Sequence, residues 1–129
     1  MAMTNRNVTL TVTSLLSIIL FLVHVSDDVA RGIDRVSAWN LIGVGIFVLW
    51  LHGTLTLGNR KSGYIIMLLG GLFGALAGMS HMILGVSRTL EKTPDGAMLF
   101  VFVLWALVVT ATFSVVLAIR GLRRREWIV

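Results

Sequence analysis

Four long apolar stretches without charged residues or proline constrain this chain more than any other feature. They run over residues 8–25, 37–57, 63–86 and 97–119. A helix needs about 20 mostly apolar residues to cross the hydrocarbon core of a bilayer. No alternation of apolar and polar residues suggests strands, and four segments are too few to close a membrane barrel. The sequence therefore predicts an all-α fold, an integral membrane four-helix transmembrane bundle.

The composition supports the same class. Hydrophobic residues make up 57% of the chain and charged residues 13%, and the mean hydropathy is +0.92. Soluble domains carry about 25% charged residues, so the composition excludes an ordinary soluble enzyme domain and a disordered chain. The absence of cysteine excludes disulfides and thiolate metal sites. Because the connections between the stretches are short, we expect a single four-helix transmembrane domain over residues 1–129.

The placement of the basic residues predicts the orientation in the membrane. Of the 11 basic residues, seven fall on the side of the two chain ends and four on the other side. Basic residues accumulate on the cytoplasmic side, so we expect cytoplasmic N and C termini in a multi-pass protein of the cell membrane. The net charge of +5 then reflects topology and contact with anionic lipids of the bilayer, not nucleic-acid binding. The seven residues are Arg6, Arg60, Lys61, Arg120, Arg123, Arg124 and Arg125.

Three histidines are the only ionisable residues within or at the edges of the predicted spans. His24 comes about seventeen residues into the first helix and His81 about eighteen residues into the third, at about 1.5 Å per residue. Both helices start on the predicted cytoplasmic side, so His24 and His81 should lie at similar depth near the outer face. His52 belongs to the inner half. The sequence therefore pairs His24 with His81.

Two carboxylates follow His24 and continue its helix face if the helix extends by one turn. Asp27 and Asp28 come three and four residues after His24, the spacing of neighbours on one face. Imidazole and carboxylate are ligands that suit zinc or iron. The predicted metal site consists of His24, Asp27, Asp28 and His81. Two alternatives stay open. The two carboxylates orient the His24 ring without binding the metal themselves, or they cap the helix end.

Glycines at every fourth position mark one face of the third helix. Gly70, Gly74 and Gly78 predict a surface for close helix packing, because small residues let helix backbones approach. His81 follows Gly78 by three residues and shares this face, so it should point toward a neighbouring helix. The same small residues leave room for a flat cofactor, so haem b held by His24 and His81 is a second interpretation.

These features leave three functional hypotheses. The leading one is an accessory or structural subunit of a larger membrane complex, or a self-associating homo-oligomer. The alternative is a haem b or divalent-metal protein, for electron transfer or metal handling, that uses His24 and His81. The third is a small-solute transporter acting as an oligomer, although the spans contain no buried carboxylate of the kind that proton coupling uses. The lack of an H-E-x-x-H motif favours a role outside enzyme catalysis.

Overall fold

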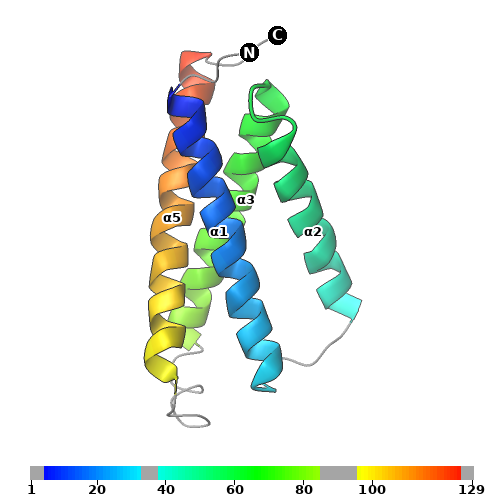
Figure 1. Ribbon diagram of the computed structural model, residues 1–129, viewed down its shortest axis with the longest axis vertical. Helices are drawn as coiled ribbons and strands as arrows, with labels where there is room; N and C mark the ends of the chain where they lie inside the picture. Colours follow the sequence, from blue (N-terminus) through cyan, green and yellow to red (C-terminus); the bar gives the residue numbers. More distant parts are fainter. Residues whose placement is uncertain (1–4, 33–37, 85–95, 126–129) are drawn as a thin grey trace.

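Four helices lie side by side in the computed structural model, which describes residues 5–32, 38–84 and 96–125 (Figure 1). Helix α1 covers Asn5–Ala30, α2 Ala38–Leu55, α3 Lys61–Leu84 and α5 Ala97–Arg124. Helices α1, α3 and α5 are each long and apolar enough to cross a membrane. For the described residues, the predicted all-helical fold with four helices is confirmed.

Helices α1 and α5 continue past the C-terminal ends of their predicted spans. Helix α1 continues to Ala30, so Asp27 and Asp28 are helical, as the extra turn considered above requires. Helix α5 continues through Arg124 and ends at Arg125, which has left-handed backbone angles. The basic cluster therefore stands on the last turns of a helix. Residues 37, 85 and 86 of the predicted spans lie outside the described residues.

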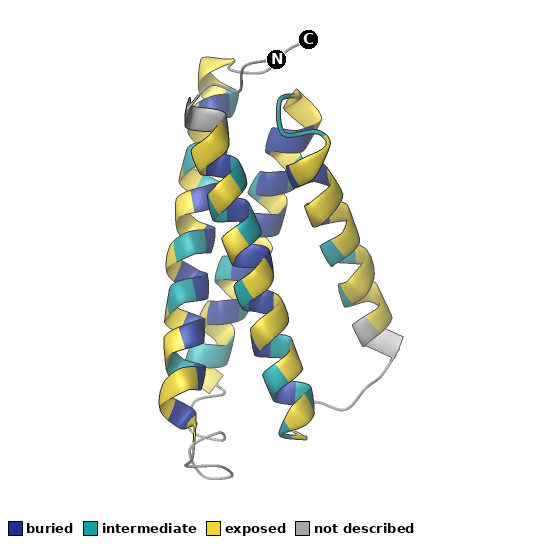
Figure 2. Ribbon diagram, viewed as in Figure 1, coloured by how far each residue is buried: buried dark blue, intermediate teal, exposed yellow. Residues whose placement is uncertain are grey.

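The helices are packed unequally. Helix α3 packs most extensively on α5, and α1 packs on α5, while α2 lies against α3 and α1. Helix α2 leans away from the others toward its Ala38 end (Figure 1), and exposed residues cover most of its length (Figure 2). Among its residues 41–55, the buried ones are Trp50, Gly53 and Thr54, all in its second half. The end of the bundle that contains the α2–α3 turn is the Arg60 end, and the opposite end is the Asp28 end.

The glycine row of α3 lies against the neighbouring helices. A Cβ atom added at Gly70 would collide with the indole ring of Trp50. One added at Gly74 would come within 3.5 Å of the Ala111 side chain, and one at Gly78 within 2.8 Å of Val108. The row thus receives Trp50 from α2 and the apolar face of α5, because the lack of side chains at these positions lets the neighbouring groups approach closely.

A closed set of hydrogen bonds fixes Trp50 against α1. The indole Nε1–H donates to Ser14 Oγ over 2.9 Å, and the Ser14 and Thr54 hydroxyl oxygens lie 2.8 Å apart. The Thr54 hydroxyl donates to the Trp50 carbonyl oxygen over 2.8 Å, so its oxygen accepts from Ser14. Buried polar groups need partners, above all in hydrocarbon. This hydrogen-bond network gives the polar groups of three buried side chains their partners. It also fixes which face of α2 packs against the bundle.

Candidate metal centre

The last turns of α1 and α3 bring His24, Asp28 and His81 together at the Asp28 end. His24 Nε2 lies 3.4 Å from Asp28 Oδ2, and His81 Nε2 lies 3.9 Å from the same oxygen. One ligand atom from each residue lies within 4.8 Å of those of the other two. The pairing of His24 with His81 follows the equal depth expected from helical rise, and the two rings meet edge to face at 4.7 Å.

The hydrogen bond of His81 defines which of its nitrogens faces the carboxylate. Nδ1 lies 2.9 Å from the Ala77 carbonyl oxygen, one turn earlier in α3. A carbonyl only accepts, so Nδ1 carries the hydrogen and donates. In the neutral ring, Nε2 then presents a lone pair toward Asp28 Oδ2. Metal-binding histidines commonly donate their second ring N–H to a backbone carbonyl in this way.

The two nitrogen–oxygen separations are longer than direct hydrogen bonds and can be compared with the ligand spacing around a metal ion. A direct N–H···O bond spans about 2.7–3.2 Å, whereas the two nitrogen–oxygen distances here are 3.4 and 3.9 Å. A tetrahedral zinc ion with bonds of about 2.0–2.2 Å places its ligand atoms about 3.4 Å apart. The His24–Asp28 distance matches this edge, and the His81–Asp28 distance needs a closure of about 0.5 Å to reach it.

The two adjacent aspartates have different surroundings. Asp27 Oδ2 accepts a 2.8 Å hydrogen bond from Arg31 Nε within an i, i+4 ion pair. Arg31 in turn lies against Gly96 at the start of α5. Successive residues of a helix point about 100° apart, so Asp28 reaches the histidines while Asp27 turns toward α5. The structure thus groups three of the four predicted ligands and places Asp27 beside His24.

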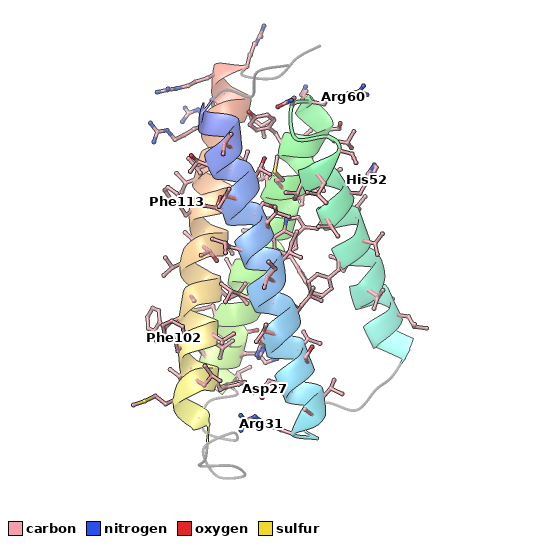
Figure 3. The ribbon with its side chains drawn as sticks, viewed as in Figure 1. Asp27, Arg31, His52, Arg60, Phe102 and Phe113 are labelled. Atoms are coloured by element: carbon pink, nitrogen blue, oxygen red, sulfur yellow. The ribbon has the colours of Figure 1, made fainter. Side chains whose placement is uncertain are left out.

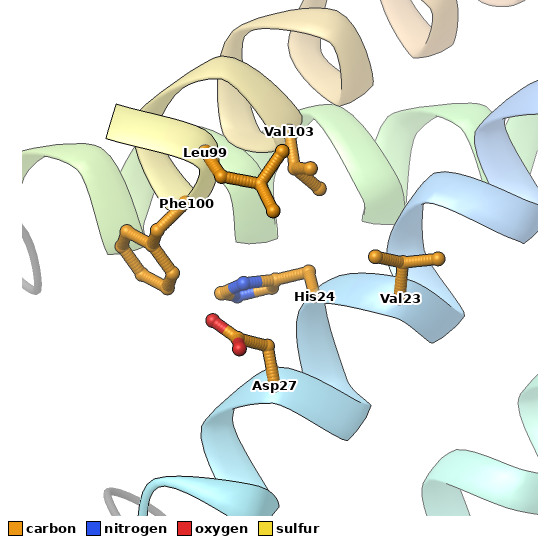
Figure 4. Close-up of a pocket in the computed structure, with 6 residues that line it drawn as sticks. All are labelled: Val23, His24, Asp27, Leu99, Phe100 and Val103. Atoms are coloured by element: carbon orange, nitrogen blue, oxygen red, sulfur yellow. The ribbon is translucent and has the colours of Figure 1, made fainter. Parts of the chain in front are cut away.

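Apolar and aromatic side chains enclose His24. The ring of Phe100 lies 5.3 Å from the imidazole and that of Phe21 6.3 Å from it. His24 and Asp28 are buried, whereas 41% of the His81 side chain is exposed. Beside His24 and Asp27 lies a cavity of about 50 Å³, bounded by Phe100 and three aliphatic side chains (Figure 4). The site is therefore buried on the His24 side and exposed on the His81 side.

This arrangement accommodates a single ion more readily than haem. A haem held by His24 and His81 would place the porphyrin between the two imidazoles, but these rings meet at 4.7 Å with Asp28 beside both. Cofactor pockets usually measure about 300–1,000 Å³, far more than the cavity at His24. Two imidazoles with one carboxylate are a donor set for zinc or ferrous iron.

His52 stands apart from this cluster, as predicted. It is exposed on α2, and its ring nitrogens lie 3.1 and 3.2 Å from the Thr56 hydroxyl oxygen of the same helix. The sequence reasoning did not single out Phe21 and Phe100, which shape the environment of His24. Phe21 could have been found because it precedes His24 by three residues and shares its face. Phe100 comes from α5, and no local pattern relates it to His24.

No family model matches this chain, and no curated protein or solved structure matches it. The geometry of the site is therefore the basis for assigning a function.

Proposed function

We propose that this chain is an integral membrane protein that binds one divalent transition-metal ion, with zinc as the best fit, near the outer face of the cell membrane. The observation that carries the metal proposal is the convergence of three donor atoms from His24, Asp28 and His81 within 4.8 Å. The lone pair of His81 Nε2 and the Asp28 carboxylate face each other at 3.9 Å. Two electron-pair donors in this position are stabilised by a cation between them.

The orientation follows from the charges of the two ends. The described basic residues at the Arg60 end are Arg6, Arg60, Lys61, Arg120, Arg123, Arg124 and Arg125. The described acidic residues, Asp27 and Asp28, belong to the opposite end. Because basic residues mark the cytoplasmic side, the Arg60 end faces the cytoplasm in our proposal. The metal centre then lies toward the outer aqueous phase.

The packing favours access from the outer side only. His81 is the exposed ligand and lies near the end of α3. One helical turn from His24, toward the Arg60 end, the ring of Phe21 packs at 5.0 Å from the ring of Phe47 and at 5.3 Å from that of Phe73. This aromatic cluster separates the metal centre from the hydroxyl groups around Ser14 and Ser17. We therefore favour metal capture or handling at the outer face over passage of an ion through the bundle.

Metal titration of the purified protein tests the proposal. We expect one zinc or cobalt ion per chain after chelator treatment and dialysis, because the cluster offers one set of three ligands. Bound cobalt should show the visible absorption bands of a tetrahedral site with nitrogen and oxygen ligands. Failure to bind either ion in proportion to protein would overturn the proposal. A Soret absorption band in the untreated protein would instead support haem.

The orientation is testable because the chain contains no cysteine. Single cysteines introduced at Lys61 and at Gly32 would each be the only thiol in the protein. In intact cells, a membrane-impermeant maleimide should label the Gly32→Cys variant and leave the Lys61→Cys variant unlabelled until the membrane is opened. The reverse labelling pattern would contradict the proposed orientation. An accessory-subunit role and small-solute transport stay predictions from the sequence.

A further inference from the structure

We propose that an anionic phospholipid of the cytoplasmic leaflet binds at the junction of α2 and α3, with its headgroup on Arg60 and Lys61 and one acyl chain in the groove between the helices. This inference rests on the proposed membrane insertion and orientation, and it concerns a site at the end opposite to the metal centre.

The groove is an apolar hollow of about 190 Å³ between α2 and α3. It forms where α2 diverges from α3, on the Asp28-end side of the contact between Gly53 and Ile66. Its lining offers no charged side chain, and its floor is formed by Trp50 and Gly70. The walls include Leu49, Ile66, Leu69 and Phe73. A groove of this composition that opens toward the bilayer suits a hydrocarbon chain.

The charges at the Arg60 end determine which lipid fits. Arg60 and Lys61 are exposed at the turn that joins α2 to α3, directly beyond the helices that form the groove (Figure 3). In the part of the chain that the structure describes, this end carries seven basic residues and no acidic one. Cations next to a span attract anionic headgroups. Charge complementarity therefore favours an anionic lipid over a zwitterionic one.

The vertical spacing suits a single lipid molecule. Ile66 and Leu69 follow Arg60 by six and nine residues, which corresponds to about 9 and 14 Å along the helix axis. A phosphate at Arg60 would therefore place the acyl chain of the same molecule at the level of the groove. Arg123 and Arg124 stand on α5, which does not contact α2 within the described residues. They provide charges at the same end but away from the groove.

Native mass spectrometry of the full chain, exchanged into detergent with phosphatidylglycerol or phosphatidylcholine, tests the proposal. Insertion is measured first, by flotation of each variant with liposomes, so that failure of the membrane proposal is seen separately. We expect one retained phosphatidylglycerol and no retained phosphatidylcholine. Removing the headgroup contacts in an Arg60→Gln/Lys61→Gln variant should reduce retention by at least about fivefold per charge. Filling the groove with Leu69→Trp should also displace the lipid.

The matched control is Arg123→Gln/Arg124→Gln, which removes the same charge from the same end. This variant should retain phosphatidylglycerol like the unmodified protein. Equal loss in both double variants would show a diffuse charge effect and overturn the site. Unchanged retention in Leu69→Trp, or equal retention of the two lipids, would overturn it as well.

Discussion

Replacing Asp28 with asparagine should abolish stoichiometric metal binding and weaken metal affinity by more than about 100-fold. Loss of an outer partner of a metal ligand already costs about 10–100-fold, and Asp28 Oδ2 lies 3.4 Å from His24 Nε2 and 3.9 Å from His81 Nε2. The amide keeps the shape of the side chain but removes the negative charge that balances the ion. Zinc or cobalt titration of the purified variant measures the effect.

The neighbouring carboxylate is the matched control. Asp27→Asn removes the same charge from the same helix turn, but Asp27 is engaged by Arg31 and lies outside the ligand group. It should retain one ion per chain. His52→Ala is the corresponding control for a histidine away from the site. Equal losses of metal affinity in Asp27→Asn and Asp28→Asn would show that the ion is held by the overall negative charge of the Asp28 end.

A second ligand variant separates loss of a metal ligand from misfolding as the cause of lost binding. Asp28 is buried, so its replacement carries a risk of altered packing. His81 is partly exposed, and truncating it to alanine disturbs fewer contacts. The His81→Ala variant should keep its helix content and its elution volume in size-exclusion chromatography while losing cobalt absorption. Retained binding in this variant would contradict its assignment as a ligand.

Replacing Gly70 with alanine should destabilise the protein by about 1–3 kcal/mol, the usual cost of overpacking a core. The added methyl group would collide with the body of the Trp50 indole, not with the end of a flexible chain. Trp50 has little freedom to yield, because it is buried and its N–H is bonded to Ser14. Unfolding in detergent by denaturant or heat measures the loss.

Gly45 provides the comparison for this substitution. It is exposed on α2, and a Cβ added there meets nothing within 4 Å. Gly45→Ala should leave stability unchanged or raise it by up to about 1 kcal/mol, because alanine is the better helix former. Equal stability of Gly70→Ala and Gly45→Ala would contradict the close contact between Trp50 and α3.

The sequence by itself determined the number and type of the helices and several of their faces. An uninterrupted apolar stretch of about 20 residues is a local property, and so is the rotation of side chains along one helix. This is why the glycine row of α3 could be assigned to packing. It is also why His24 and His81 could be matched in depth from the number of residues that precede them.

Only the tertiary structure decided which groups meet across helices. The spacing from His24 admits both Asp27 and Asp28, and the direction from which α3 and α5 approach α1 separates their roles. The partnership of Trp50 with Ser14 and the lean of α2 likewise depend on packing between helices. Helical periodicity fixes a side chain's direction around its own axis, whereas its partner depends on the crossing and rotation of a second helix.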